Sequence, residues 1–267
     1  MTFALSPHTP MLLFGCGNMG RAMLDGWLRS GVDPASFIVV DPNAQNVPDG
    51  VAVHTDSRSL DLRFSLCLLA TKPQIFAAVA TDVERLVLPD ALILSLLAGT
   101  RCATLQTNLP GRQIVRLMPN LAASLGKSPI GIFSAIAEEQ SAFDALLAPL
   151  GTCYWMKAED QMDAVTALAG SGPAFVYRFI DALAKAGVEL GLDPRQSLGL
   201  AQSMVLGAAE LSSSLDCTPN ELAQRVTSPG GTTAAGLSIL DADDALLRLV
   251  KATLAAARDR GIELAKA

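Results

Sequence analysis

The stretch Met11-Leu-Leu-Phe-Gly-Cys-Gly-Asn-Met-Gly20 decides how the first half of the chain folds. Its first four residues are apolar, as in a buried parallel strand, and Arg21–Ser30 carries apolar residues at helical spacing. The pattern Gly-x-Gly-x-x-Gly between them permits a tight turn, a close approach of a pyrophosphate, and close packing of helix on strand. An ordinary glycine-rich turn is the alternative. In this context the stretch predicts a dinucleotide-binding loop that uses Gly15, Gly17, Asn18, Met19 and Gly20.

A second apolar strand, Phe37–Val40, ends at Asp41, about 20 residues after the loop. An acid at this place accepts a hydrogen bond from the ribose 2′-hydroxyl of NAD. Asp41 is equally suited to start a turn, because Pro42-Asn43 follows it. No Lys or Arg lies between Arg29 and Arg58 to bind the 2′-phosphate of NADPH. The residues therefore predict NADPH or NADH as the cofactor and favour NADH.

Strand and helix patterns alternate through the rest of the first half, which predicts an α/β fold with a doubly wound parallel sheet of the Rossmann type. Ligands of such sheets bind beyond the carboxyl ends of the strands. We expect the residues at these ends to line the cofactor, although the prolines among them would also serve as strand stops. These residues are Thr71, Lys72, Pro73, Ala98, Gly99 and Asn120. The strands are expected at Phe64–Ala70, Ala91–Leu97, Gln113–Met118, Ile130–Ser134 and Cys153–Met156, and the helices at Gln74–Leu86, Thr100–Leu109 and Glu138–Leu150.

The last third of the chain contains only helical patterns. We therefore predict a dinucleotide-binding domain over residues 1–158 and an all-α domain over residues 159–267. The helical part is rich in Ala and Gly, which lets helices approach closely, and it carries apolar stripes. Packing against a second copy, as in a homodimer, is the working hypothesis, and core packing within one chain is the alternative. The helices are expected at Asp163–Leu190, with an interruption at 170–173, and at Arg195–Ser212, Asn220–Arg225 and Asp243–Lys266.

The turn Ser228-Pro-Gly-Gly-Thr-Thr233 lies between two of these helical stretches. Its Pro-Gly-Gly predicts a turn and its Thr-Thr predicts a helix start. Several backbone N–H groups and three hydroxyls would then face one point at the positive end of a helix dipole. A helix cap alone needs only one such hydroxyl. The stretch therefore predicts a pocket for a small anion, such as a carboxylate or a phosphate.

Composition and charge exclude several classes of function. The net charge is −6 and no basic cluster occurs, which argues against a nucleic-acid partner. The apolar runs are too short for a membrane span and the N-terminus lacks the features of a signal peptide, so we expect a cytoplasmic protein without a membrane partner. Five separated cysteines without a Cys-x-x-Cys pair, and two histidines, argue against disulfides and a metal site.

Five motifs together resemble the pyrroline-5-carboxylate reductase family over about residues 11 to 260. The resemblance implies NAD(P)H-dependent reduction of the cyclic imine 1-pyrroline-5-carboxylate to L-proline, the last step of proline biosynthesis. It also implies a Rossmann domain followed by an all-α dimerisation domain, with dimers that often assemble further. The motifs are Gly15–Gly20, Thr71-Lys-Pro73, Met118-Pro-Asn120, Asp163–Ala174 and Val226–Thr233, of which the last two are specific to the family.

The resemblance also implies roles for single residues. Thr233 would hydrogen-bond the imine nitrogen, and the turn that contains it would hold the substrate carboxylate. The chain departs from the family pattern at Leu121-Ala122, where the family usually has Thr-Pro, and at Phe175, where it often has Tyr. The implied substrate-binding residues are Ser228, Gly230, Gly231, Thr232 and Thr233, and Ser171, Gly172 and Pro173 would contact the cofactor.

The sequence offers few histidines or lysines that could act as catalytic bases, and an imine reductase does not need them. A cyclic imine is partly protonated near neutral pH, so the protein mainly has to orient it and the cofactor. A β-hydroxyacid-type dehydrogenase of the same architecture is the first alternative, and it would need a catalytic lysine, for which Lys185 and Lys72 are the candidates. A non-catalytic NAD(H)-binding sensor is the second, and it would not need the Ser228–Thr233 turn.

Overall fold

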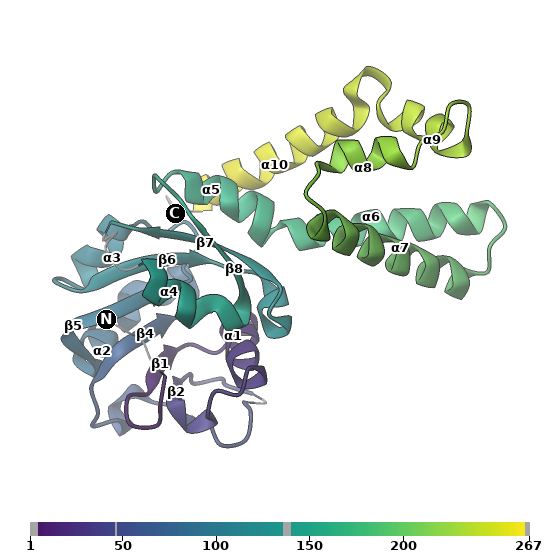
Figure 1. Cartoon of the computed structure of the whole chain (residues 1–267). Coiled ribbons are helices and arrows are strands. Elements are labelled where there is room, and N and C mark those ends of the chain that lie inside the picture. Colours follow the sequence, from purple (N-terminus) through teal and green to yellow (C-terminus); the bar gives the residue numbers. More distant parts are fainter. Residues whose placement is uncertain (1–4, 46, 136–139, 265–267) are drawn as a thin grey trace. The chain divides into compact units, whose positions relative to one another are not determined.

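The structure is a computed structural model that describes residues 5–45, 47–135 and 140–264 (Figure 1). It contains two compact units. Unit 1 comprises Met1–Gly170 and Ala257–Ala267, and unit 2 comprises Ser171–Ala256. The predicted domain boundary between residues 158 and 159 stays a prediction, because compactness does not show which part folds on its own.

Unit 1 is built on a sheet that has eight strands in the described residues, in the order β3-β2-β1-β4-β5-β6-β7-β8. All neighbouring strands are parallel except β6 and β7, which are antiparallel. The strands are β1 (Met11–Phe14), β2 (Phe37–Val40), β3 (Ala52–His54), β4 (Phe64–Leu69), β5 (Val87–Ser95), β6 (Gln113–Met118), β7 (Ser128–Ser134) and β8 (Gly151–Trp155).

Helices cover both faces of this sheet (Figure 1). Because side chains alternate between faces along a strand, Leu13 and Leu12 of β1 enter two separate cores. The core of Leu13 includes Trp27 of α1 (Asn18–Arg29) and Leu147 of α4 (Gln140–Leu147). The core of Leu12 includes residues of α2 (Phe76–Leu86) and α3 (Cys102–Asn108). The predicted doubly wound sheet is thereby confirmed.

The antiparallel pairing of β6 and β7 was not predicted. A short connection joins these strands, and it contains a 3-10 helix at Leu121–Leu125. Parallel neighbours need a crossover of a dozen residues or more, whereas a short connection lets the second strand return beside the first. This connection places residues 120–125 at the carboxyl end of β6.

Unit 1 continues into α5 (Gln161–Val165), followed by a π-helix at Thr166–Gly170. A single π-turn of this kind is uncommon and often lies at a functional site. Unit 2 begins directly after it. Its helices are α6 (Gly172–Glu189), α7 (Pro194–Ser214), α8 (Pro219–Arg225) and α9 (Thr232–Leu240), and α10 (Ala245–Leu264) contributes residues to both units.

Unit 2 packs α6 against α7 and leaves many large apolar side chains exposed. The Ser197 hydroxyl of α7 donates to the Ala184 carbonyl of α6 at 2.7 Å, and Gly187 leaves no room there for a side chain. Tyr177 is 65% exposed and Ile239 is 73% exposed. Exposed apolar surface of this extent is typical of an interaction site. Among the described residues, no helix has the length and apolar character needed to cross a membrane.

Candidate functional site

The glycine loop between β1 and α1 has the geometry that a pyrophosphate requires. Gly15 has φ +94°, and a Cβ on it would lie 2.8 Å from the carbonyl carbon of Ala70. A Cβ on Gly20 would lie 3.0 Å from the Ala70 Cβ. Around Gly17, by contrast, no atom of the described residues other than its two chain neighbours lies within 4 Å of such a Cβ. Two of the glycines therefore allow close packing, and Gly17 borders open space.

The start of α1 at this loop is left open for an anion. Gly17 is its N-cap residue, and in the described part of the chain no side chain caps it. No acidic residue lies in the first turn. The first N–H groups of a helix lack partners within the helix, and the helix dipole adds positive potential at this end. The residues present therefore fit the phosphates of a dinucleotide.

A buried hydroxyl without a partner lies after β4. Thr71 Oγ1 is shielded from solvent and has no hydrogen-bond partner in the described part of the chain. A Cβ on Gly15 would lie 2.9 Å from the Thr71 backbone nitrogen, so Thr71 adjoins the glycine loop. A buried polar group without a partner costs about 1–3 kcal/mol. A bound cofactor that hydrogen-bonds this hydroxyl would remove that cost.

Asp41 lies at the loop as well, and it also forms the predicted turn. Its Oδ2 accepts the Cys16 N–H at 2.7 Å, and its Oδ1 accepts the Asn43 N–H at 2.7 Å. Each carboxylate oxygen can accept a second hydrogen bond. Burial, and secondly the Asp41 charge, raise the pKa of the Cys16 thiol to about 11, so this thiol stays protonated near neutral pH.

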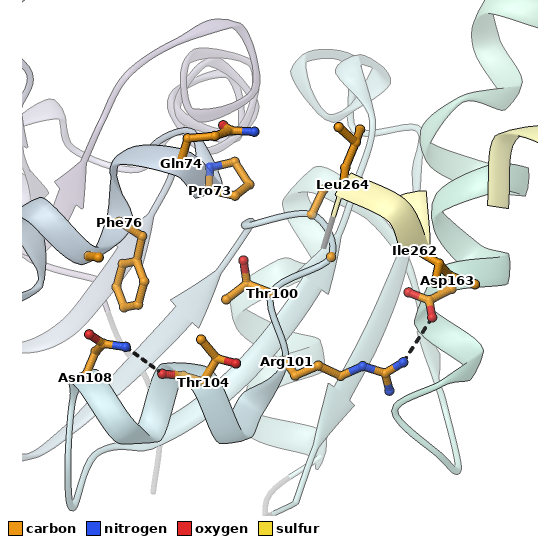
Figure 2. Close-up of a pocket in the computed structure, with 13 residues that line it drawn as sticks. Pro73, Gln74, Phe76, Thr100, Arg101, Thr104, Asn108, Asp163, Ile262 and Leu264 are labelled. Carbon is orange, nitrogen blue, oxygen red and sulfur yellow. Dashed lines mark hydrogen bonds and ion pairs between the residues drawn. The ribbon is translucent and has the colours of Figure 1, made fainter. Parts of the chain in front are cut away.

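Two pockets of unit 1 contain predicted cofactor residues. One, of about 590 Å³, lies beside Gly17 and Asn18 and extends to Asn43 beyond β2. The other, of about 470 Å³, is lined by Pro73, Ala98 and Gly99, among others. Figure 2 shows the second pocket, with Arg101 directed at Asp163 and Ile262 and Leu264 of α10 on one side.

Asn120 was predicted to contact the cofactor, and its side chain forms hydrogen bonds with backbone groups. Its Oδ1 accepts the Ala122 N–H at 2.9 Å, and its Nδ2 donates to the Ala169 carbonyl at 3.1 Å. Its own N–H donates to Ser128 Oγ at 2.9 Å. With 8% of its surface exposed, Asn120 ties the end of β6 to the π-helix. A cofactor contact by Asn120 stays a prediction.

Sequence reasoning missed a buried ion pair next to these strand ends. Arg116 of β6 is 2% exposed, and its Nη1 lies 2.8 Å from Oε1 of Glu159. The same oxygen accepts the Cys102 N–H at 2.6 Å. Burial alone would raise the pKa of Glu159, but these hydrogen bonds and the Arg116 charge outweigh it and hold the pKa below its usual value. The only sequence signal was a charged residue inside an apolar strand.

The residues predicted to bind an anion lie in unit 2 and form a turn and a helix start. The Gly231 N–H donates to the Ser228 carbonyl at 3.0 Å, and Gly230 has φ +70°, as in a type II turn with Pro229 at its second position. Within the described residues no side chain caps α9, which begins at Thr232. A Cβ on Gly231 would lie 2.5 Å from Ser228 Oγ, so this hydroxyl lies beside the helix start. The turn thus combines unpaired N–H groups with hydroxyls, as an anion requires.

The remaining predicted site residues lie at helix starts or on exposed surface. Ser171 is the N-cap of α6, and Gly172 and Pro173 form its first turn. Lys185 is 70% exposed in its side chain and forms an ion pair with Asp181 at 2.7 Å. Among the described residues, no group of three or more His, Cys, Asp or Glu side chains is placed to hold a metal ion.

Comparison with known proteins places these features in a family. The family model described as pyrroline-5-carboxylate reductase dimerisation matches residues 159–264. The pyrroline-5-carboxylate reductase of Pseudomonas aeruginosa is 35% identical over 97% of this chain and 98% of its own length. The pyrroline-5-carboxylate reductase of Pisum sativum is 34% identical over 95% of this chain and 96% of its own length.

Solved structures agree with these relatives. The NADP-bound pyrroline carboxylate reductase of Plasmodium falciparum has a TM-score of 0.85 and 25% identity, over 97% of this chain and 99% of that chain. The pyrroline-5-carboxylate reductase of Coxiella burnetii has a TM-score of 0.85 and 29% identity, over 96% and 98% of the two chains. With such relatives along nearly its whole length, this chain belongs to the pyrroline-5-carboxylate reductase family.

Proposed function

We propose that this chain reduces 1-pyrroline-5-carboxylate to L-proline with NADH or NADPH. The observation that carries the proposal is 35% identity to a pyrroline-5-carboxylate reductase over 97% of the chain. In the reaction the imine carbon gains a hydride and the nitrogen keeps or gains a proton, so that a C=N bond becomes a CH–NH bond. The nicotinamide ring, when bound, supplies this hydride.

The residues of unit 1 fit the cofactor. The open space at Gly17 and the uncapped start of α1 would receive the pyrophosphate. The buried Thr71 hydroxyl would donate a hydrogen bond to the cofactor. The Pro73 and Gly99 segments would line the nicotinamide side of the site. The Pro73 and Gly99 segments present backbone or small side chains, which leave room for the flat nicotinamide ring. The proposed cofactor-binding residues are those predicted from the sequence, with Asn120 acting through its hydrogen bonds to backbone.

The residues of unit 2 fit the substrate. The N–H groups at the start of α9 and the Ser228 hydroxyl would hold the substrate carboxylate, because both favour an anion. Thr233, the second residue of α9, would hydrogen-bond the imine nitrogen and hold the substrate ring in one orientation. Holding both reactants in a fixed geometry is the main contribution that this reaction asks of the protein.

Neither lysine considered for the β-hydroxyacid dehydrogenase alternative is placed as that reaction requires. Lys185 is paired with Asp181 on the exposed surface, so it is poorly placed to act as a buried base. Lys72 precedes the 3-10 helix Pro73–Ile75 at the end of β4 and belongs to the nucleotide-binding unit. An imine substrate needs neither residue as a base.

Cofactor preference and self-association extend the proposal. Asp41 lies at the glycine loop, and no Lys or Arg between Arg29 and Arg58 could bind a 2′-phosphate. Both observations support NADH over NADPH. The exposed apolar side chains of unit 2 and the dimerisation family model support a homodimer formed by this unit.

The test is a direct assay of the purified chain. NADH and NADPH oxidation would be followed with 1-pyrroline-5-carboxylate. In parallel, reduction of NAD+ and NADP+ would be followed with a panel of 3-hydroxy acids. We expect turnover with the imine only. Oxidation of a hydroxy acid that is lost in Lys185→Ala, without turnover of the imine, would favour the dehydrogenase instead.

A further inference from the structure

Leu121 is a large apolar side chain that lies exposed beside the glycine loop. Its side chain lines the pocket of about 590 Å³ that also contains Gly17 and Asn18 at the start of α1. It is 53% exposed. An exposed leucine is ordinary on a protein surface, but one that faces a pocket with convergent backbone N–H groups is typical of a ligand site.

The segment that carries Leu121 is held firmly on both sides. Asn120 accepts the Ala122 N–H and donates to the Ala169 carbonyl, which fixes the start of the 3-10 helix Leu121–Leu125. Ala123 of the same helix is fully buried. Leu121 therefore projects from a backbone that cannot easily move away.

Contacts with α1 fix the other side of this helix. Gly26 of α1 lies so close to the Ala123 carbonyl that a Cβ would collide with it. Arg29 Nε donates to the Ser124 carbonyl at 3.1 Å. The helix that begins at the glycine loop and the helix that carries Leu121 thus hold each other in place.

From this geometry we propose that Leu121 is a cofactor-binding residue, an apolar wall that packs on the bound dinucleotide at the glycine loop. The proposal rests on the proposed function, because it takes the ligand of the loop to be NADH or NADPH. Contact with the cofactor buries the leucine, which favours binding. Excluding water beside Gly17 also strengthens the hydrogen bonds from the helix start to the phosphates.

Position, and not exposure, distinguishes Leu121 from its neighbour Leu125. Leu125 lies on the same 3-10 helix and is 62% exposed, yet it is not among the residues that line this pocket. The two leucines therefore offer a matched pair. Truncating either leucine to alanine removes the same atoms from an exposed position of the same helix. Only Leu121 borders the proposed dinucleotide site.

The test is a fluorescence titration of NADH, without imine, into the wild type, Leu121→Ala, Leu121→Met and Leu125→Ala. Losing half the burial of a leucine should raise the NADH Kd of Leu121→Ala roughly three- to tenfold. Leu121→Met keeps an apolar wall and should stay within about twofold of the wild type. Leu125→Ala should leave the Kd unchanged.

An unchanged Kd in Leu121→Ala, or an equal rise in Leu125→Ala, would overturn the proposal. A changed sedimentation coefficient of Leu121→Ala with an unaltered Kd would overturn it too, because Leu121 would then face another chain. Failure of the proposed function shows separately. A wild type that binds NADH but does not reduce the imine would refute the reaction and leave the Leu121 comparison intact.

Discussion

Replacing Arg116 by Met removes one partner of the buried ion pair in β6. Met fills a similar volume, so the main change is electrostatic. The variant leaves the Glu159 carboxylate with the Cys102 N–H as a donor, at 2.6 Å, and without the guanidinium at 2.8 Å. An uncompensated charge then remains where water reaches it poorly.

The expected loss follows from the exposure of the two side chains. Breaking a fully buried ion pair from one side costs about 3–5 kcal/mol. The Arg116 side chain is 3% exposed but that of Glu159 is 20% exposed, so water recovers part of this energy. We therefore expect Arg116→Met to lower the free energy of unfolding by about 2–3 kcal/mol near neutral pH. The double variant Arg116→Met/Glu159→Gln should recover part of the loss.

The effect should depend on pH with a defined sign. The pKa of Glu159 lies below its ordinary value of 4.5, because the hydrogen bonds and the Arg116 charge outweigh burial. A carboxyl group with a lowered pKa contributes its stability above the ordinary value and loses it as the pH falls through the folded-state pKa. The difference between wild type and Arg116→Met should therefore be full near neutral pH and shrink as the pH falls below 4.5.

Urea unfolding followed by circular dichroism measures this difference. One protomer concentration must be used throughout, because the stability of an oligomer depends on it. A loss below about 1 kcal/mol near neutral pH is what an exposed ion pair gives, and it would contradict the expected cost of the buried charge. A difference that grows as the pH falls would refute the sign.

Three further predictions concern the sites themselves. Gly17→Ala should leave stability unchanged and raise the NADH Kd about tenfold or more, because its Cβ enters the open space proposed for the phosphates. Gly15→Ala should destabilise the fold itself, because Gly15 has a positive φ and its Cβ would collide with Ala70. Chemical unfolding and NADH titration of both variants distinguish the two effects. Thr233→Ala should lower kcat/KM for the imine roughly 10- to 100-fold with an unchanged NADH Kd. Thr233→Ser keeps the hydroxyl and should recover most of the activity. Equal losses in both variants would count against a hydroxyl contact. Asp41→Ala should raise the Kd of NADH more than that of NADPH, and equal rises would show that Asp41 only supports the Cys16 loop.

Local patterns in the sequence were enough to predict the elements that carry both sites. The glycine loop, the turn at Asp41 and the turn at Ser228 each depend on residues close in the chain, and the structure has each of them. Their glycines and prolines restrict the backbone directly. This is why the strand, turn and helix around Gly15 follow from about twenty residues.

Contacts between distant residues were not predictable in this way. Asn120 reaches the Ala169 carbonyl and Arg116 reaches Glu159, so these pairs depend on how the π-helix and the segment before α5 pack beside β6. The antiparallel β7 likewise depends on how the chain turns after Asn120. No local propensity encodes such partners, because tertiary packing decides them.

Identification of the product shows whether the chain forms L-proline. The purified chain would be incubated with 1-pyrroline-5-carboxylate and a limiting amount of NADH or NADPH, and the products separated by chiral chromatography. We expect L-proline, with one molecule formed for each reduced cofactor oxidised, and we expect Thr233→Ala to form it far more slowly. Cofactor oxidation without proline, or no oxidation of either cofactor, would contradict the proposed function.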